Sequence, residues 1–267
     1  MNSSSLPKIL ITNDDGVHSP GILAAINAVS SFAEVMVLAP ASQQTAMGRA
    51  YRGNPDATLV ETTLTVRGVP FKAFSCEASP ARTIDHGLTV LSGYQPDFII
   101  SGINYGENLG SSITSSGTVG AAMEAAHRGI PSIAVSLETP VDTHLTYTDQ
   151  DWTAATYFLQ HFTKRAIHEG FPQGIDLLKI DVPSSASTEC PWRVTRLSHN
   201  SYYRTDLSSP SMESRLKDYV ITKGLIQGEP EDTDIYAIAV DKVVSVTPLR
   251  LDFTAHGSMN DLHKWGK

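Results

Sequence analysis

The sequence has little cysteine and no long apolar run. Cys76 and Cys190 are its two cysteines, and their wide separation argues against a disulfide framework or a zinc knuckle. No apolar run approaches the roughly 20 residues needed to cross a bilayer. Residues 1–8 lack the apolar centre of a signal peptide. These features predict a cytoplasmic protein without a membrane anchor.

Positive charge is also scarce, because 20 basic side chains face 28 acidic ones and the formal net charge is -8. This balance argues against a nucleic-acid duplex or an anionic membrane as the main partner. A small anion can still bind locally. The 267 residues are enough for one large α/β domain or for a domain with an extension.

Apolar runs of strand length alternate with segments of helical periodicity over most of the chain. Strand, helix, strand in this order predicts right-handed parallel crossovers, and therefore a Rossmann-like three-layer α/β core with a mainly parallel sheet. We expect strands at 8–13, 33–38, 58–66, 69–74, 97–101, 132–137 and 177–182, helices at 20–32, 80–91, 117–128 and 152–169, and a Gly/Ser/Asn-rich loop at 104–116.

The character of the sequence changes after Pro183. Residues 184–235 are polar and rich in Ser, Thr and Pro, and the next apolar segments, 235–240 and 242–246, are interpreted as part of an extension that carries hairpins. We therefore expect a catalytic core at 1–183, an extended arm at 184–235 and C-terminal strands at 236–267. Long segments outside a core often form interfaces, so Tyr202 and Tyr203 either anchor a partner subunit or pack internally.

Two adjacent acids, Asp14 and Asp15, follow the first expected strand directly. Neighbouring residues within a strand point to opposite faces, but a strand that breaks into a glycine turn lets both carboxylates converge. Magnesium and manganese prefer such oxygen ligands. The alternative is ordinary turn chemistry, because Asn, Asp and Gly all favour turns.

Two further strand ends carry neutral oxygen donors. Ser42 and Thr45 lie in the loop after the second strand, and Asn104 follows the strand at 97–101. Because the carboxyl ends of parallel strands meet at one edge of a sheet, we expect these side chains near Asp14 and Asp15. Hydroxyl and amide oxygens would complete the coordination of a divalent cation.

Ser115, Ser116, Gly117 and Thr118 stand at the start of the expected helix 117–128. Free backbone N–H groups and the helix dipole make such a position an anion site. Helix capping by Ser or Thr is the alternative interpretation. An acidic metal site opposite an anion-binding helix start describes metal-assisted phosphoester hydrolysis.

Five motifs stand out in chain order: TNDDGVHSPGI, LAP followed by QQTAMG, SGINYGENLG, SSGTVGAAMEA and VSVTPLRLDFT. Together they make the chain similar to the SurE (survival protein E) family of metal-dependent 5'-nucleotidases and acid phosphatases. The resemblance covers the first 137 residues almost continuously and returns at 177–183 and 231–254.

The resemblance implies hydrolysis of nucleoside 5'- and 3'-monophosphates with one Mg²⁺ or Mn²⁺ per subunit, and a swapped arm and C-terminal segment that build a homodimer or homotetramer. Most family members have serine where this chain has Thr45, whose methyl group restricts χ1, so Ser42 is the alternative ligand. The implied metal ligands are Asp14, Asp15, Thr45 and Asn104; the implied phosphate cradle is Ser115, Ser116, Gly117 and Thr118, lined by Gly106 and Asn108.

We expect water to attack the phosphate directly, with Asp14 or Asp15 helping to deprotonate it. A covalent aspartyl-phosphate is the alternative, although a carboxylate that ligates a metal is a weak nucleophile. A response-regulator receiver and a nucleotide-binding regulator without turnover are the other candidate functions. His18 is interpreted as structural, and Arg49 and Arg52 as surface residues.

Overall fold

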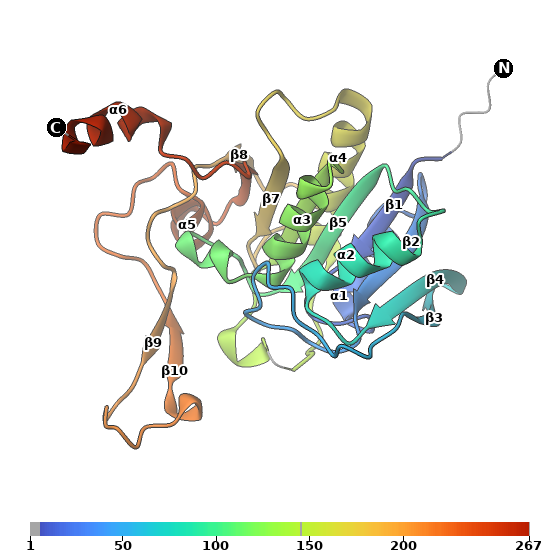
Figure 1. Ribbon diagram of the computed structural model, residues 1–267, viewed down its shortest axis with the longest axis horizontal. Coiled ribbons are helices and arrows are strands. Elements are labelled where there is room, and N and C mark those ends of the chain that lie inside the picture. The colour runs from blue at the N-terminus through green and yellow to red at the C-terminus, as the bar shows by residue number, and fades with distance from the viewer. Residues whose placement is uncertain (1–5, 145, 267) are drawn as a thin grey trace.

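One central sheet organises the protein. The computed structural model describes residues 6–144 and 146–266, and within them nine strands form a sheet in the order β3-β4-β2-β1-β5-β6-β7-β11-β8 (Figure 1). The bounds are β1 Lys8–Thr12, β2 Glu34–Pro40, β3 Val60–Val66, β4 Val69–Cys76, β5 Phe98–Tyr105, β6 Ser132–Leu137, β7 Leu177–Val182, β8 Trp192–Val194 and β11 Val244–Leu249.

The side of the sheet on which new strands are added changes between β1 and β5. After β1 the chain builds β2 and β4 on one side, and it then returns to place β5, β6 and β7 on the other side of β1, all parallel to it. Strands β3 and β11 are antiparallel to their neighbours β4 and β7. Ligands of open α/β sheets bind in the crevice that forms at such a switch point.

Helices cover both faces of the sheet and bury its centre. Helices α1 (Pro20–Val29) and α4 (Thr153–Glu169) pack on one face, and α2 (Pro80–Val90) and α3 (Gly117–His127) on the other (Figure 1). Alternate residues of β1 point to opposite faces of the sheet. Ile9 and Ile11 belong to the core on the side of α1 and α4, and Leu10 belongs to the core on the side of α2 and α3. Each such burial contributes roughly 1.5–3 kcal/mol, which explains the continuous apolar runs at 9–11 in β1 and 98–100 in β5.

The expected Rossmann-like core is confirmed, and β6 and β7 match their predicted bounds. The prediction for β5 is wrong at its end, because the strand continues to Tyr105 and places Asn104 inside it instead of in the following loop. The pairing of β5 with β6 shifts between Ser101 and Asn104, and Gly102 has a φ of +134°. A bulge of this kind bends the strand and redirects the side chains that follow it.

The C-terminal region also departs from the prediction. Residues 235–240 are helical instead of β: α5 (Asp234–Tyr236) leads into a π-helical turn at Ala237–Asp241. The Thr233 side chain caps α5 by accepting from the amide of Tyr236 at 3.3 Å. Strand β11 follows and pairs with β7 of the same chain. The short helix α6 (Met259–Leu262) lies near the C-terminus.

A two-stranded hairpin projects from the body of the protein. It consists of β9 (Tyr203–Asp206) and β10 (Val220–Lys223), which pair antiparallel, and Figure 1 shows it extending away from the sheet. Val220 and Ile221 are exposed on it, as is Leu216 near its tip. Within the described residues, no helix combines the length and apolar character that crossing a membrane requires.

Candidate active site

The turn that follows β1 holds two buried carboxylates. Asp14 and Asp15 are 6 % and 3 % exposed. The Asn13 side chain closes the turn, because its Oδ1 accepts from the Gly16 amide at 3.1 Å and its Nδ2 donates to the Ser19 hydroxyl at 2.6 Å. Gly16 supports the turn with a φ of +102°. The sequence Asn-Asp-Asp-Gly therefore forms a rigid turn that presents its two acids at the β1/β5 switch point.

Asp14 rests against the start of α3. The Thr118 hydroxyl donates to Asp14 Oδ1. Gly117 lies so close that a Cβ atom at this position would be 2.7 Å from Asp14 Cβ and 2.8 Å from its Oδ2. Ser116 caps the helix by accepting from the Val119 amide at 3.1 Å. The helix start that the sequence predicts as a phosphate cradle thus adjoins the acidic pair.

Asp15 is held by β5 and by the loop after β2. The Tyr105 amide donates to Asp15 Oδ2 at 3.2 Å, and Gln43 Nε2 approaches Oδ1 at 3.4 Å. In addition, the Gln44 amide donates to the Asp14 carbonyl at 2.6 Å. The end of β5, the loop after β2 and the start of α3 therefore fix the positions of the two acids.

No basic side chain in residues 6–144 and 146–266 forms an ion pair with Asp14 or Asp15. Burial raises the pKa of Asp14 to about 6, although hydrogen bonds from Thr118 and from the Gly117 amide oppose the shift. Burial and the adjacent Asp14 charge raise the pKa of Asp15 well above its usual range. Two buried acids without a protein counter-charge fit a bound divalent cation, which would reverse both shifts.

Further ligands would have to be neutral oxygens, since the described residues contain no cluster of three or more His, Cys, Asp or Glu side chains suited to a metal. Asn104 fits this role. Its Nδ2 donates to the carbonyls of Tyr105 and Gly106 at 3.2 and 2.6 Å, which leaves Oδ1 as the atom for a ligand. The backbone of Ser42 packs against Gly16, and Thr45 is exposed just after Gln44. The hydroxyls of Ser42 and Thr45 therefore lie on either side of Gln43 and Gln44, which contact the two acids.

Ser115 of the predicted cradle, and Asn108 of the loop that lines it, have other partners. Ser115 is exposed and donates to the Ser112 carbonyl at 2.9 Å. The Asn108 side chain donates to the Ser136 hydroxyl at 2.8 Å, and its amide donates to Asp181 at 2.7 Å. Gly106 is packed so closely against His144 that a Cβ atom would lie 2.6 Å from the ring Nε2. The loop 106–110 is thus fixed by the protein itself.

Comparisons with known proteins agree with this geometry. Residues 9–204 match the family described as Survival protein SurE. The chain belongs to the SurE family. It is 39% identical over 93% of both chains to a protein of Methanocella arvoryzae and 37% identical over 96% of this chain and 97% of the relative from Thermococcus kodakarensis, both named 5'-nucleotidase SurE. The crystal structure of the Sure protein from Aquifex aeolicus superposes with a TM-score of 0.75 at 28% identity, covering 98% of this chain and 100% of that one.

Membership of the SurE family excludes the receiver-domain alternative. The structure also places the remaining sequence candidates. His18 is exposed, and Arg49 pairs with Glu124 at 2.9 Å. Arg52 lines a separate surface cavity of about 320 Å³ with Arg82 and His86.

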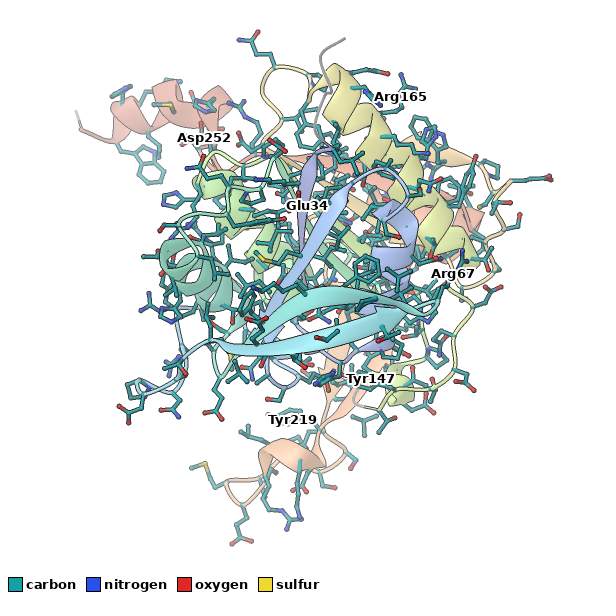
Figure 2. The ribbon with its side chains drawn as sticks, turned by 90° about the vertical axis from the view of Figure 1, so that its right-hand side faces the viewer. Glu34, Arg67, Tyr147, Arg165, Tyr219 and Asp252 are labelled. Atoms are coloured by element: carbon teal, nitrogen blue, oxygen red, sulfur yellow. The ribbon has the colours of Figure 1, made fainter. Side chains whose placement is uncertain are left out.

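Sequence reasoning missed the segment that covers Asp15. The Tyr147 hydroxyl donates to the Asp15 carbonyl, and the Tyr105 hydroxyl donates to the Thr148 carbonyl at 2.7 Å. The two rings lie 5.6 Å apart, and Gln43 Nε2 donates to the His144 carbonyl at 2.6 Å. Figure 2 marks the position of Tyr147. Tyr105 lies inside a family motif and was accessible to sequence reasoning, whereas Tyr147 lies in a polar loop without a local signal.

Proposed function

We propose that the chain is a divalent-metal-dependent phosphomonoesterase that hydrolyses nucleoside 5'- and 3'-monophosphates to nucleoside and phosphate. The observation that carries this proposal is the buried pair Asp14 and Asp15, which lacks a basic partner among the described residues and adjoins the start of α3. The relatives named 5'-nucleotidase SurE support the 5'-nucleotidase part of this activity.

Each residue of the site has a distinct role in this proposal. Asp14, Asp15 and Asn104 would hold the metal, together with the hydroxyl of Thr45 or Ser42. A bound divalent metal supplies positive charge to the phosphate and lowers the pKa of a nearby water. Thr118 holds Asp14, and the Tyr105 amide holds Asp15, so neither carboxylate has to reorganise during the reaction.

The reaction proceeds by direct attack of water on phosphorus. Asp14 or Asp15 takes the proton from the water, and the bond between phosphorus and the nucleoside oxygen breaks in line with the attack. The nucleoside leaves as an alkoxide, which takes up a proton from solvent. Phosphate binds at the start of α3, where backbone N–H groups and the helix dipole favour an anion. Because these contacts address only the phosphate, selection among bases is expected to be weak.

Removal of the metal is expected to abolish turnover. Phosphate release should be measured with a panel of nucleoside 5'- and 3'-monophosphates in Mn²⁺ or Mg²⁺, in EDTA, and after the metal is restored. We expect activity on several bases, loss of activity in EDTA and recovery with added metal. Absence of turnover with every metal would favour the nucleotide-binding regulator, and hydrolysis of a single nucleotide would contradict weak base selection.

Metal affinity is expected to fall in acid. In the metal-free protein the pKa of Asp14 is raised to about 6 and that of Asp15 is raised well above its usual range, so protons compete with the metal as the pH falls through 6. We expect the dissociation constant for Mn²⁺, measured by titration calorimetry, to rise about tenfold or more between pH 7.5 and pH 5.5. An equal dissociation constant at both pH values would show that Asp14 and Asp15 do not bind the metal.

We also propose that the β9–β10 hairpin is the arm through which subunits associate into a homodimer or homotetramer. Its exposed Val220, Ile221 and Leu216 are the apolar residues that an interface would cover. Light scattering should therefore give a mass of two or four chains. A stable monomer at micromolar concentration would eliminate this role.

A further inference from the structure

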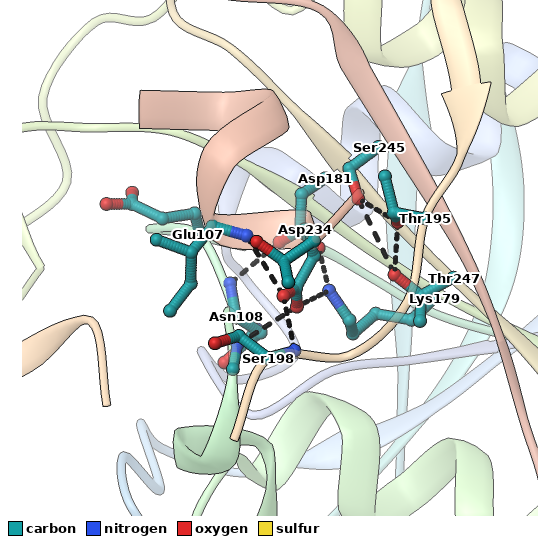
Figure 3. Close-up of polar contacts among 12 residues, drawn as sticks. Glu107, Asn108, Lys179, Asp181, Thr195, Ser198, Asp234, Ser245 and Thr247 are labelled. Atoms are coloured by element: carbon teal, nitrogen blue, oxygen red, sulfur yellow. Dashed lines mark hydrogen bonds and ion pairs between the residues drawn. The ribbon is translucent and has the colours of Figure 1, made fainter. Parts of the chain in front are cut away.

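A lysine with two carboxylate partners lies buried beneath the loop that follows β5. Lys179 on β7 is fully buried, and its Nζ forms ion pairs with Asp181 and with Asp234 Oδ2, the latter at 3.0 Å. Figure 3 shows the three side chains together. Burying charged groups costs several kcal/mol per ion unless their partners are well placed. Apolar side chains of the same volume would stabilise the fold at least as well. The contacts of the cluster therefore indicate a second role.

Both carboxylates bind the backbone of loop 106–110. Asp181 accepts from the Asn108 amide at 2.7 Å, and Asp234 Oδ2 accepts from the Gly110 amide at 2.9 Å. The other oxygen of Asp234 accepts from the Ser198 amide at 3.0 Å. Two amides of the loop are thus fixed to one charged cluster, which is anchored in β7 and at the start of α5.

This loop directly continues the strand that holds the acidic pair. Asn104 lies two residues before Gly106, and the Tyr105 amide donates to Asp15 at 3.2 Å. The Asn108 side chain is tied to Ser136 on β6, the neighbour of β7. A shift of loop 106–110 would therefore change the backbone at Tyr105 and the orientation of Asn104.

We propose that Lys179, Asp181 and Asp234 are positioning residues of the active site: through the Asn108 and Gly110 amides they hold loop 106–110, and with it Asn104 and the Tyr105 amide, in the arrangement that metal binding and turnover require. This inference rests on the proposed phosphatase function. A misplacement of about 1 Å can lower turnover about 100-fold, so the expected effect falls on kcat and metal affinity more than on KM.

Asp181 provides the sharpest test, because its loss leaves Lys179 paired one-to-one with Asp234. Asp181→Leu removes the acceptor of the Asn108 amide, whereas Asp181→Asn retains a side-chain oxygen that can accept this hydrogen bond. We expect Asp181→Leu to lower kcat and Mn²⁺ affinity about 10- to 100-fold with KM within about threefold. Asp181→Asn should remain within about fivefold of wild type in kcat.

A neighbouring hydroxyl cluster offers a matched control. Thr195 is buried beside the charged cluster and shares hydrogen bonds with Ser245 and Thr247 at 2.7 and 2.8 Å (Figure 3), and neither of these bonds involves loop 106–110. Thr195→Val should therefore lower thermal stability without changing kcat or Mn²⁺ affinity. If Thr195→Val impairs catalysis as much as Asp181→Leu does at equal stability, the effect is general destabilisation and the proposal is wrong.

Hydrogen exchange of the wild-type protein tests the proposal without a variant. The Asn108 and Gly110 amides should exchange as slowly as amides of the central strands, and in folded Asp181→Leu the Asn108 amide should exchange at least tenfold faster. Fast exchange of both amides in wild type, or wild-type kcat and metal affinity in folded Asp181→Leu, would overturn the proposal. If wild type shows no turnover, the proposed function fails, while exchange and Mn²⁺ binding still decide whether the cluster positions the loop.

Discussion

Replacing Asp14 with Asn is expected to lower turnover about a thousandfold and to raise the stability of the metal-free protein at neutral pH. The loss of turnover follows because the variant removes a metal-binding carboxylate and a candidate proton acceptor, and a positioned acid or base alone typically accounts for about 100- to 10,000-fold. Steady-state kinetics with Mn²⁺ measures this loss.

The gain in stability follows from the raised pKa of Asp14. Its pKa of about 6 in the folded protein, against an ordinary value of 3.8, means that the ionised carboxylate destabilises the fold above pH 6 by roughly 1–3 kcal/mol. This penalty fades as the pH falls toward 4. Calorimetry in EDTA should therefore give Asp14→Asn a higher Tm than wild type at pH 8, and the difference should narrow at pH 5.

Asp56→Asn is the matched control, because Asp56 is an exposed acid in the loop between β2 and β3. It should leave both turnover and Tm close to wild type. Turnover above a tenth of wild type in Asp14→Asn would remove Asp14 from the active site. A lower Tm in EDTA would show that the acidic pair stabilises the fold instead of opposing it.

Replacing Gly117 with Ala is expected to lower turnover about 100-fold. In an ordinary helix this substitution stabilises by about 1 kcal/mol. Here the new Cβ would lie 2.7 Å from Asp14 Cβ and 2.8 Å from its Oδ2, so either the carboxylate or the start of α3 must move. A displacement of about 1 Å is enough for a loss of this size, which kcat and Mn²⁺ affinity would report together.

Gly93→Ala is the control for this substitution, since no heavy atom outside its chain neighbours lies within 4 Å of a Cβ built there. It should leave kcat and Mn²⁺ affinity unchanged. Full activity in Gly117→Ala would mean that the close contact between α3 and Asp14 has no part in the chemistry.

The central strands could be predicted from the sequence because their apolar runs have clear limits. Strands β6 and β7 have bounds identical to those expected, since glycine, proline or polar residues flank each of these runs. Residues 235–240 were assigned wrongly because six apolar or small residues fit a strand and a helix equally well. Contacts distant in sequence decide this case: Asp234 binds Lys179 and the Gly110 amide.

The candidate site was only partly accessible from sequence. Asp14, Asp15 and Asn104 follow or end parallel strands, and the rule for strand ends brings them to one edge. That Thr118 contacts Asp14 directly, and that Asn108 turns toward Ser136, depends on side-chain directions that no local pattern encodes. The hydrogen bond from Tyr147 to the Asp15 carbonyl joins residues that are distant in sequence, and no local pattern predicts it.

The switch point between β1 and β5 also determines when during folding the site can form. The contacts of Asp14 and Asp15 with Thr118 and Tyr105 join residues 104 and 90 positions apart, and closing such large loops is slow compared with forming helices. No short fragment of the chain can contain the acidic pair and its supports together. In a refolding experiment, the contacts of Asp14 and Asp15 with Thr118 and Tyr105 should therefore form only when the central sheet is complete.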